Sequence, residues 1–180
     1  PSAADLGYGD GYSDIMATEK SFTFLTNASW TPDLQSGWSI SNWTPIYNIN
    51  YFLVHMREAK GLSEATYNHY EGTARFWRAW QYFEKVKTFG AVPWYDEPID
   101  PEDMVALYKP RDSREYVMER VLEDLNFACE HCYTSSDWIN CARINRYIAL
   151  AYKARVCLFE GTYRKYHSVD PSTGKAWEDK

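Results

Sequence analysis

Two cysteines and a histidine lie close enough in the sequence to suggest metal chemistry. Cys129 and Cys132 are separated by two residues, one of which is His131. Structural zinc takes four such ligands, usually as two closely spaced pairs. The nearest further candidate is Cys141, which has no second ligand at a short spacing. We therefore predict no metal site and interpret Cys129 and Cys132 as buried thiols.

The cysteines leave one redox alternative open. Cys132 and Cys141 flank a short loop, and a disulfide between them would close it. We keep this disulfide as an alternative to the interpretation of free thiols. Cys157 lies in an apolar helical segment, where a cysteine behaves as a small hydrophobic residue. We expect it to be an inert core residue.

Other residue types used in catalysis are present but are not arranged for it. The four histidines are scattered, and nucleophile-elbow, P-loop and zinc-protease motifs are missing from the sequence. The acidic stretch 96–103 could hold calcium or supply a carboxylate pair for glycoside hydrolysis. It lacks the calcium-loop spacing, however, and Pro98 and Pro101 favour an exposed, extended loop. We therefore expect no catalytic residue and no cofactor.

Aromatic residues are the strongest candidates for binding, because eight Trp, fifteen Tyr and eight Phe make up 17% of the chain. Such rings either fill a core or form flat platforms for ligands. In loops, a Trp ring can stack on a sugar while a nearby Asn binds its hydroxyls. We therefore predict Trp30, Trp38 and Asn42 as ligand-binding residues. The alternative is that both rings cover the core and that Asn42 is a turn residue. Three further tryptophans are assigned to the core: Trp43, Trp77 and Trp80.

Charge and hydropathy exclude several classes of protein. A net charge of −6 and a pI near 5.2 argue against nucleic-acid binding, which needs a basic face. No apolar run reaches the length of about 18 residues that is expected of a membrane-spanning helix. A chain of 180 residues is large enough for one domain. Because it begins without Met and ends in a hydrophilic run, we expect it to be part of a longer protein.

Hydrophobic periodicity predicts four helices, over residues 44–61, 63–89, 113–132 and 145–160. The first begins at Thr44 and Pro45, a favourable pair for the cap and first position of a helix. Gly90 ends the second, Asp112 or Ser113 caps the third, and Asn145 caps the fourth. Residues 1–41 are predicted to be irregular, with a short strand at 22–25.

The helical spacing also predicts which sides are buried. In the second helix, Arg78 and Lys85 are placed opposite the apolar face. The fourth helix is apolar nearly all round, and only Lys153 and Glu160 mark its solvent side. The third helix should bury one stripe: Val117, Val121, Leu125, Ala128 and Cys132.

Two charged residues fall on the apolar sides of these predicted helices. Asp124 lies at the edge of the third helix's apolar stripe, and Arg155 lies within the apolar face of the fourth. A buried charge is very costly without a partner. We therefore predict an ion pair between Arg155 and Asp124 across the hairpin that these two helices form.

Three groups of residues recur together in the order typical of one family. The first is Ile46 followed by Asn50-Tyr51-Phe52-Leu53. The second is Gly72-x-Ala74-Arg75-Phe76-Trp77-Arg78-Ala79, then Tyr82-Phe83 and Phe89-Gly90-Ala91-Val92-Pro93. The third is Arg111-x-Ser113, Asp124-Leu125 and the run from Ala154 to Tyr163. In this combination, residues 42–163 resemble the SusD/RagB family, the surface glycan-binding lipoproteins of Bacteroidetes. The chain departs from the family pattern at Thr73, Trp77 and Ala91, where Glu, Leu and Asp are usual.

The resemblance implies an all-α fold of tetratricopeptide-like helical hairpins with long irregular loops. The expected division is an irregular region 1–41, a helical core 42–163 and a loop 164–180. The resemblance further implies non-catalytic capture of oligosaccharides, a SusC-like TonB-dependent transporter as partner, and an N-terminal lipid that anchors the protein on the outer-membrane surface. The rival hypotheses are a fragment of an all-helical carbohydrate-active enzyme and a helical-repeat adaptor that binds another protein.

Overall fold

A computed structural model describes residues 37–100, 102–134 and 143–177. Four long helices and two short ones account for most of the described part: α3 (Ile40–His55), a short 3₁₀ helix η1 (Met56–Glu58), α4 (Glu64–Phe89), α5 (Met104–Leu107), α6 (Arg114–His131) and α7 (Arg146–Tyr166). Within the described ranges, β-structure is limited to two isolated bridges, Val92 with Asp112 and Val169 with Ala176. The strand predicted at 22–25 lies outside the described residues.

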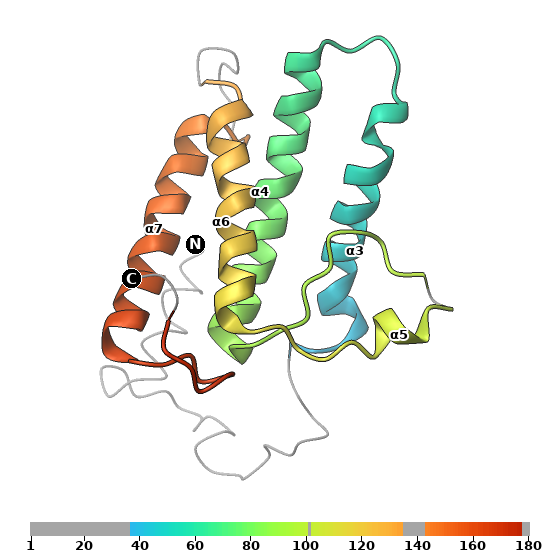
Figure 1. The fold of residues 1–180 in the computed structure, drawn as a ribbon. Helices are drawn as coiled ribbons and strands as arrows, with labels where there is room; N and C mark the ends of the chain where they lie inside the picture. The colour runs from blue at the N-terminus through green and yellow to red at the C-terminus, as the bar shows by residue number, and fades with distance from the viewer. Residues whose placement is uncertain (1–36, 101, 135–142, 178–180) are drawn as a thin grey trace, which may run out of the picture. The chain divides into compact units, whose positions relative to one another are not determined.

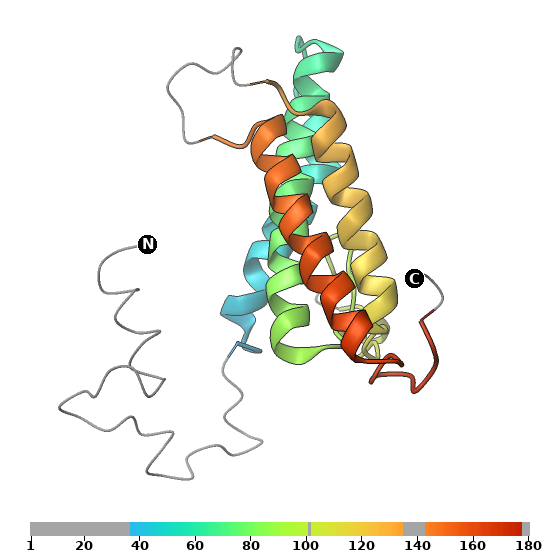
Figure 2. The same ribbon diagram turned by 90° about the vertical axis from the view of Figure 1, so that its left-hand side faces the viewer.

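The long helices alternate in direction, as Figures 1 and 2 show. Consecutive long helices therefore form antiparallel hairpins, α3 with α4 and α6 with α7. The most extensive packing joins α4 to α6. Close approach there depends on Gly72, since a Cβ atom at this position would lie 3.0 Å from the Sγ atom of Cys132. Contacts along the chain separate two units, Pro1–Ser39 and Ile40–Lys180.

The predicted end of α4 and the predicted caps of α6 and α7 are confirmed. The Ser63 hydroxyl accepts a hydrogen bond from the Thr66 N–H at 3.2 Å, and Gly90 ends α4 with a positive φ of 70°, which glycine adopts without strain. Ser113 caps α6 by accepting from the Tyr116 N–H at 3.2 Å. The Asn145 side chain accepts from two backbone N–H groups at the start of α7, each at 3.0 Å.

The predicted start of α3 is wrong. The helix begins at Ile40, so Pro45 lies inside it. Thr44 does not cap, because its hydroxyl donates to the Ile40 carbonyl at 2.9 Å, one turn back within the helix. A proline at this depth removes one backbone hydrogen bond. The fixed φ of proline still suits a helix, so the pair Thr44 and Pro45 can lie inside a helix as well as at its start. The pair therefore did not mark the first residue of α3.

The core lies between α4, α6 and one side of α7. The predicted stripe of α6 is buried as expected, and so are Phe76, Phe83 and Val86 of α4. In contrast, α7 buries only Ala149, Val156 and Glu160. The remaining apolar face of α7 is not core as predicted: Ile148, Leu150, Cys157, Leu158 and Phe159 are exposed.

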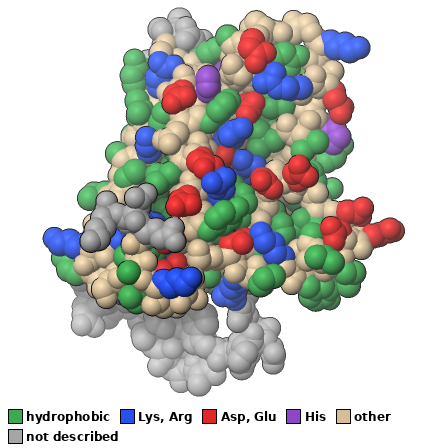
Figure 3. Space-filling view, viewed as in Figure 1, with side chains coloured by type: hydrophobic (Ala, Val, Ile, Leu, Met, Phe, Trp, Pro, Cys, Tyr) green, Lys and Arg blue, Asp and Glu red, His purple; other side chains and the backbone are tan. Residues whose placement is uncertain are grey.

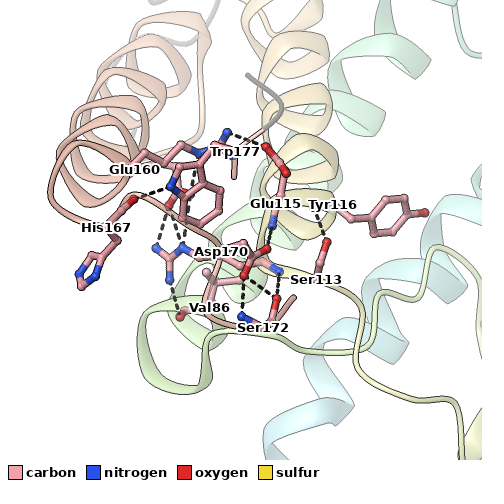
Figure 4. A network of polar contacts seen from close by, with 11 residues as sticks. Val86, Ser113, Glu115, Tyr116, Glu160, His167, Asp170, Ser172 and Trp177 are labelled. Atoms are coloured by element: carbon pink, nitrogen blue, oxygen red, sulfur yellow. Dashed lines mark hydrogen bonds and ion pairs between the residues drawn. The ribbon is translucent and has the colours of Figure 1, made fainter. Parts of the chain in front are cut away.

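Glu160 was predicted to mark the solvent side of α7, and this prediction is wrong. Its carboxylate is buried and binds the guanidinium of Arg114, with Oε2 at 2.7 Å from Nη2. Arg164 also reaches it, through a contact of 3.1 Å between Nε and Oε1. Figure 4 shows this network beside Asp170 and Ser172, where the chain returns after α7. Paired in this way, the carboxylate is stable inside the fold.

Among the described helices, none has both the length and the apolar character needed to cross a lipid bilayer. On the face shown in Figure 3, acidic and basic side chains lie intermingled with hydrophobic ones.

Candidate functional site

The centre of the fold is a buried ion pair between α4 and α6. Arg78 donates to both carboxylate oxygens of Asp124, from Nε at 2.7 Å and from Nη2 at 2.8 Å. Arg75 adds a longer contact of 3.7 Å. The predicted partner of Asp124 is therefore wrong, because Arg155 lies exposed on α7. Asp124 is buried as predicted, but its partner is on α4, at a position that periodicity assigned to solvent.

The ion pair also fixes the segment that follows α4. Arg78 Nη1 donates to the Asn50 side-chain oxygen at 3.1 Å and to the Asp96 carbonyl at 3.3 Å. The Asn50 amide in turn donates to the carbonyls of Tyr95 at 2.8 Å and Glu97 at 3.3 Å. Buried polar groups that are satisfied in this way rigidify their surroundings. The network thus ties α3, α4, α6 and the segment after Pro93 into one rigid frame.

Four aromatic rings pack at the end of this frame, near the start of α3. We call Trp43, Tyr82, Trp94 and Tyr95 the Trp43 cluster. Trp43 meets Tyr82 and Tyr95 edge-on, with ring centroids at 6.4 Å and 6.1 Å, and Tyr82 lies 4.1 Å from Trp94. The Tyr95 N–H donates to the Tyr82 hydroxyl at 2.7 Å. Burial raises the pKa of Tyr82, so this hydroxyl stays neutral.

Lys85 lies against the same cluster and was wrongly predicted to be exposed. Only 6% of its surface is accessible, and its Nζ atom lies 4.3 Å from the centre of the Trp43 ring. Among the described residues it has no carboxylate partner. Burial lowers the pKa of this ammonium group below its ordinary value, because the charged form loses hydration.

Replacing Lys85 by methionine is expected to stabilise the protein by about 1 kcal/mol at pH 7, because it removes an unpaired buried charge and keeps the aliphatic packing. Since the folded-state pKa of Lys85 is lowered, the unfolded state binds more protons between that pKa and the unfolded value of about 10.4. The wild-type protein therefore gains stability as the pH rises through this window, and the advantage of K85M should shrink.

Urea unfolding of both proteins at pH 7 and pH 10 tests this expectation. Lys153→Met on α7 is the control for a half-exposed lysine. A K85M protein less stable than wild type at pH 7 would show that the contact between Lys85 and the Trp43 ring outweighs the loss of hydration.

The structure describes two of the three predicted ligand residues. Trp30 lies outside the described residues. Trp38 is half-buried and comes just before α3, whereas Asn42 is exposed in the first turn of α3. Trp43, predicted as core, is half-buried in the Trp43 cluster. Asn42 thus adjoins a residue that is held firmly by aromatic packing.

Trp77 shows most clearly what the sequence prediction missed. It was assigned to the core, yet 43% of its surface is accessible. Its ring lines a groove between α3 and α4 together with Phe52 and Tyr70. Trp80, also predicted as core, is half-buried. Periodicity put Trp77 at the flank of the apolar face, and this angular position was the available signal.

The cysteines stay apart from any site in the described chain. Burial raises the pKa of Cys132 to about 11, so this side chain is a neutral thiol at neutral pH. Cys129 is half-buried, and burial raises its pKa as well. Cys141 lies outside the described residues, so a disulfide between Cys132 and Cys141 stays an open alternative. The described residues contain no cluster of three His, Cys, Asp or Glu side chains that could hold a metal ion.

Most of the chain matches the model of a known family. The model of a SusD-like family, described as starch-binding and associating with the outer membrane, matches residues 9–158. The chain belongs to this SusD-like family. Among curated proteins, none matches the chain significantly.

Solved structures give the same fold. A SusD-like protein from Bacteroides fragilis is 29% identical with a TM-score of 0.56, over 66% of this chain and 23% of that one. Surface glycan-binding protein A from Bacteroides fluxus is 24% identical with a TM-score of 0.55, over 74% and 29% of the two chains. A SusD-like carbohydrate-binding protein from Bacteroides fragilis is 21% identical with a TM-score of 0.60, over 73% and 26%.

These matches confirm the predicted all-α fold of tetratricopeptide-like hairpins. The matched region is, however, only part of each of these proteins. The SusD-like chain covers between 23% and 29% of the length of these three structures. Helices α3, α4 and α6 fall entirely within the family match, and α7 falls within it up to Leu158.

Proposed function

We propose that this chain belongs to a protein that captures oligosaccharides at the cell surface without cleaving them. The observation that carries the proposal is the family match over residues 9–158, whose description names starch binding. The names of two similar structures, a surface glycan-binding protein and a SusD-like carbohydrate-binding protein, support it. The aromatic content of the chain fits the same function, because stacking on rings is a common way to hold sugars.

The residues proposed for this role are Trp30, Trp38 and Asn42. A tryptophan ring offers a flat apolar surface, and an asparagine amide both donates and accepts hydrogen bonds. Asn42 is exposed in the first turn of α3, and the residue that follows it, Trp43, is anchored in the Trp43 cluster. Such anchoring lowers the entropic cost of holding a ligand group in place.

The proposal extends to the partners of the protein. An N-terminal lipid would hold it on the outer-membrane surface, and a SusC-like TonB-dependent transporter would receive the captured oligosaccharide. The family description supports the association with the outer membrane. Affinity purification of the protein from solubilised outer membranes should recover the transporter, and protease treatment of whole cells should remove the protein from their surface.

Calorimetric titration of the protein in its natural length with a glycan panel, combined with product analysis, tests the capture function. Binding without released reducing ends supports it. Release of reducing ends would indicate an enzyme instead. Failure to bind any glycan, together with tight binding of the transporter, would favour an adaptor.

A further inference from the structure

A groove of about 360 Å³ lies between α3 and α4. We call it the α3–α4 groove, and its volume falls within the range of about 300–1,000 Å³ typical of small-molecule sites. We propose that it binds a neutral pyranose unit of an oligosaccharide, with Trp77 as the stacking platform. The proposal rests on glycan capture as the function and adds a subsite on the helices. The residues that carry it are Asn48 and Phe52 of α3 and Tyr70, Trp77 and Gln81 of α4.

Three aromatic side chains leave part of their surface accessible in this groove. The accessible fractions are 42% for Phe52, 42% for Tyr70 and 43% for Trp77. Tyr70 and Trp77 are two turns apart on α4, so they share one face of the helix. Single exposed hydrophobic residues are common, but several gathered in one concave surface indicate a binding site.

Trp77 is held in place although it is exposed. Phe76 meets its ring nearly perpendicularly at 5.5 Å, and Trp80 does so at 5.9 Å. Edge-on contacts of this kind are favourable for aromatic rings. A ring that is already fixed loses little conformational freedom when a ligand stacks on it. Trp77 is therefore preorganised as a platform.

Two amide side chains supply hydrogen-bonding groups at one end of the groove. Asn48 lies one turn before Phe52, and Gln81 lies one turn after Trp77. Because α3 and α4 are antiparallel (Figure 1), these positions fall at the same end. In the described part of the chain, neither amide hydrogen-bonds to a protein group. Each can both donate to and accept from a sugar hydroxyl.

The absence of charged residues from the lining of the groove indicates which class of sugar it can bind. None of its lining residues carries a charge at neutral pH. An anionic sugar such as a uronic acid would lose hydration there without gaining a counter-charge, which is costly. A neutral pyranose has apolar faces for the rings and hydroxyl groups for the amides. The groove thus matches a neutral sugar in both its apolar and its polar parts.

Calorimetry on the protein in its natural length tests the subsite with four neutral probes: maltoheptaose, laminariheptaose, xylohexaose and mannohexaose. Trp77→Ala should weaken binding of the best probe by about tenfold or more, as truncation of an anchoring tryptophan does. Trp77→Phe should retain part of the affinity because a ring remains. Tyr116→Ala is the matched control, since Tyr116 is a comparably exposed aromatic on α6 and should leave the affinity unchanged.

The outcomes separate this subsite from the proposed function. If the wild-type protein binds a probe and W77A binds it within twofold, the subsite is rejected and glycan capture stands. If the wild-type protein binds none of the four, capture of neutral glycans fails and the subsite fails with it. Oligogalacturonate is titrated as an anionic fifth probe: if the wild-type protein binds it and W77A does not, the neutral ligand class is wrong. Thermal unfolding of each variant shows whether a lost affinity reflects the groove or the fold.

Discussion

Replacing Asp124 by asparagine should destabilise the protein by about 3–5 kcal/mol, the usual effect of removing one member of a buried ion pair. The asparagine keeps the size of the side chain but leaves the guanidinium of Arg78 without a counter-charge. Arg78 is itself only 6% accessible, so solvent cannot compensate. Its hydrogen bonds to Asn50 and to the Asp96 carbonyl should weaken as well, because the same guanidinium makes them. The measurement is the free energy of unfolding in urea.

Two controls define this result. Glu123→Gln removes a neighbouring carboxylate on the exposed side of α6, where it contacts Arg120 at 2.7 Å, and should cost less than about 1 kcal/mol. Arg155→Ala should be equally mild, because Arg155 lies exposed on α7. A large effect of Arg155→Ala together with a small effect of D124N would contradict the pair between Arg78 and Asp124.

Much of the fold was predictable because its signals are local. Ser63, Ser113 and Asn145 cap their helices through hydrogen bonds to residues two or three positions away. The stripe of α6 was predictable for a similar reason, since it packs along one line against α4 and follows the helical period. The start of α3 failed because the pair Thr44 and Pro45 also fits inside a helix.

The buried charges could not be predicted from periodicity. Arg78 is 46 residues from Asp124, and Arg114 is 46 residues from Glu160. Which residues meet at such separations depends on how the helices pack. Periodicity assigns a charged residue to solvent by default, and this placed Arg78, Lys85 and Glu160 on the wrong side. Asp124 was recognised as misplaced, but the choice among several arginines required the structure.

The candidate site was predictable only in part. The tryptophans in and near the irregular N-terminal stretch led to the predicted ligand residues, and Trp30, Trp38 and Asn42 remain proposals. The exposed surface of Trp77 was missed because an apolar residue at the flank of a helix is buried or exposed according to how closely the neighbouring helix packs. The space between α3 and α4 decides this for Trp77, and no local pattern encodes that space.

A second large effect is expected where the chain returns after α7. Glu160→Gln should also cost about 3–5 kcal/mol, since the carboxylate balances the buried guanidinium of Arg114. Arg114 has further contacts that hold it in place, a stack on Tyr163 at 3.7 Å and a hydrogen bond to the Val86 carbonyl at 3.4 Å. It therefore cannot move out to solvent when its partner is neutralised. Glu119→Gln, at an exposed position of α6, is the control and should have little effect.

Removing the Glu160 carboxylate should also loosen its surroundings, because this carboxylate orients Arg164 through a contact of 3.1 Å. Arg164 in turn binds Glu115 at 3.1 Å and lies over the ring of Trp177 at 4.8 Å. Hydrogen exchange should therefore accelerate in residues 167–177 of E160Q but not in those of D124N, when both are compared at equal global stability. Equal exchange in the two variants would show that this segment is held by Asp170 and Ser172 alone.

A double replacement of Arg114 and Glu160 by methionine should recover most of the lost stability, since well-packed apolar residues can replace a buried pair without net cost.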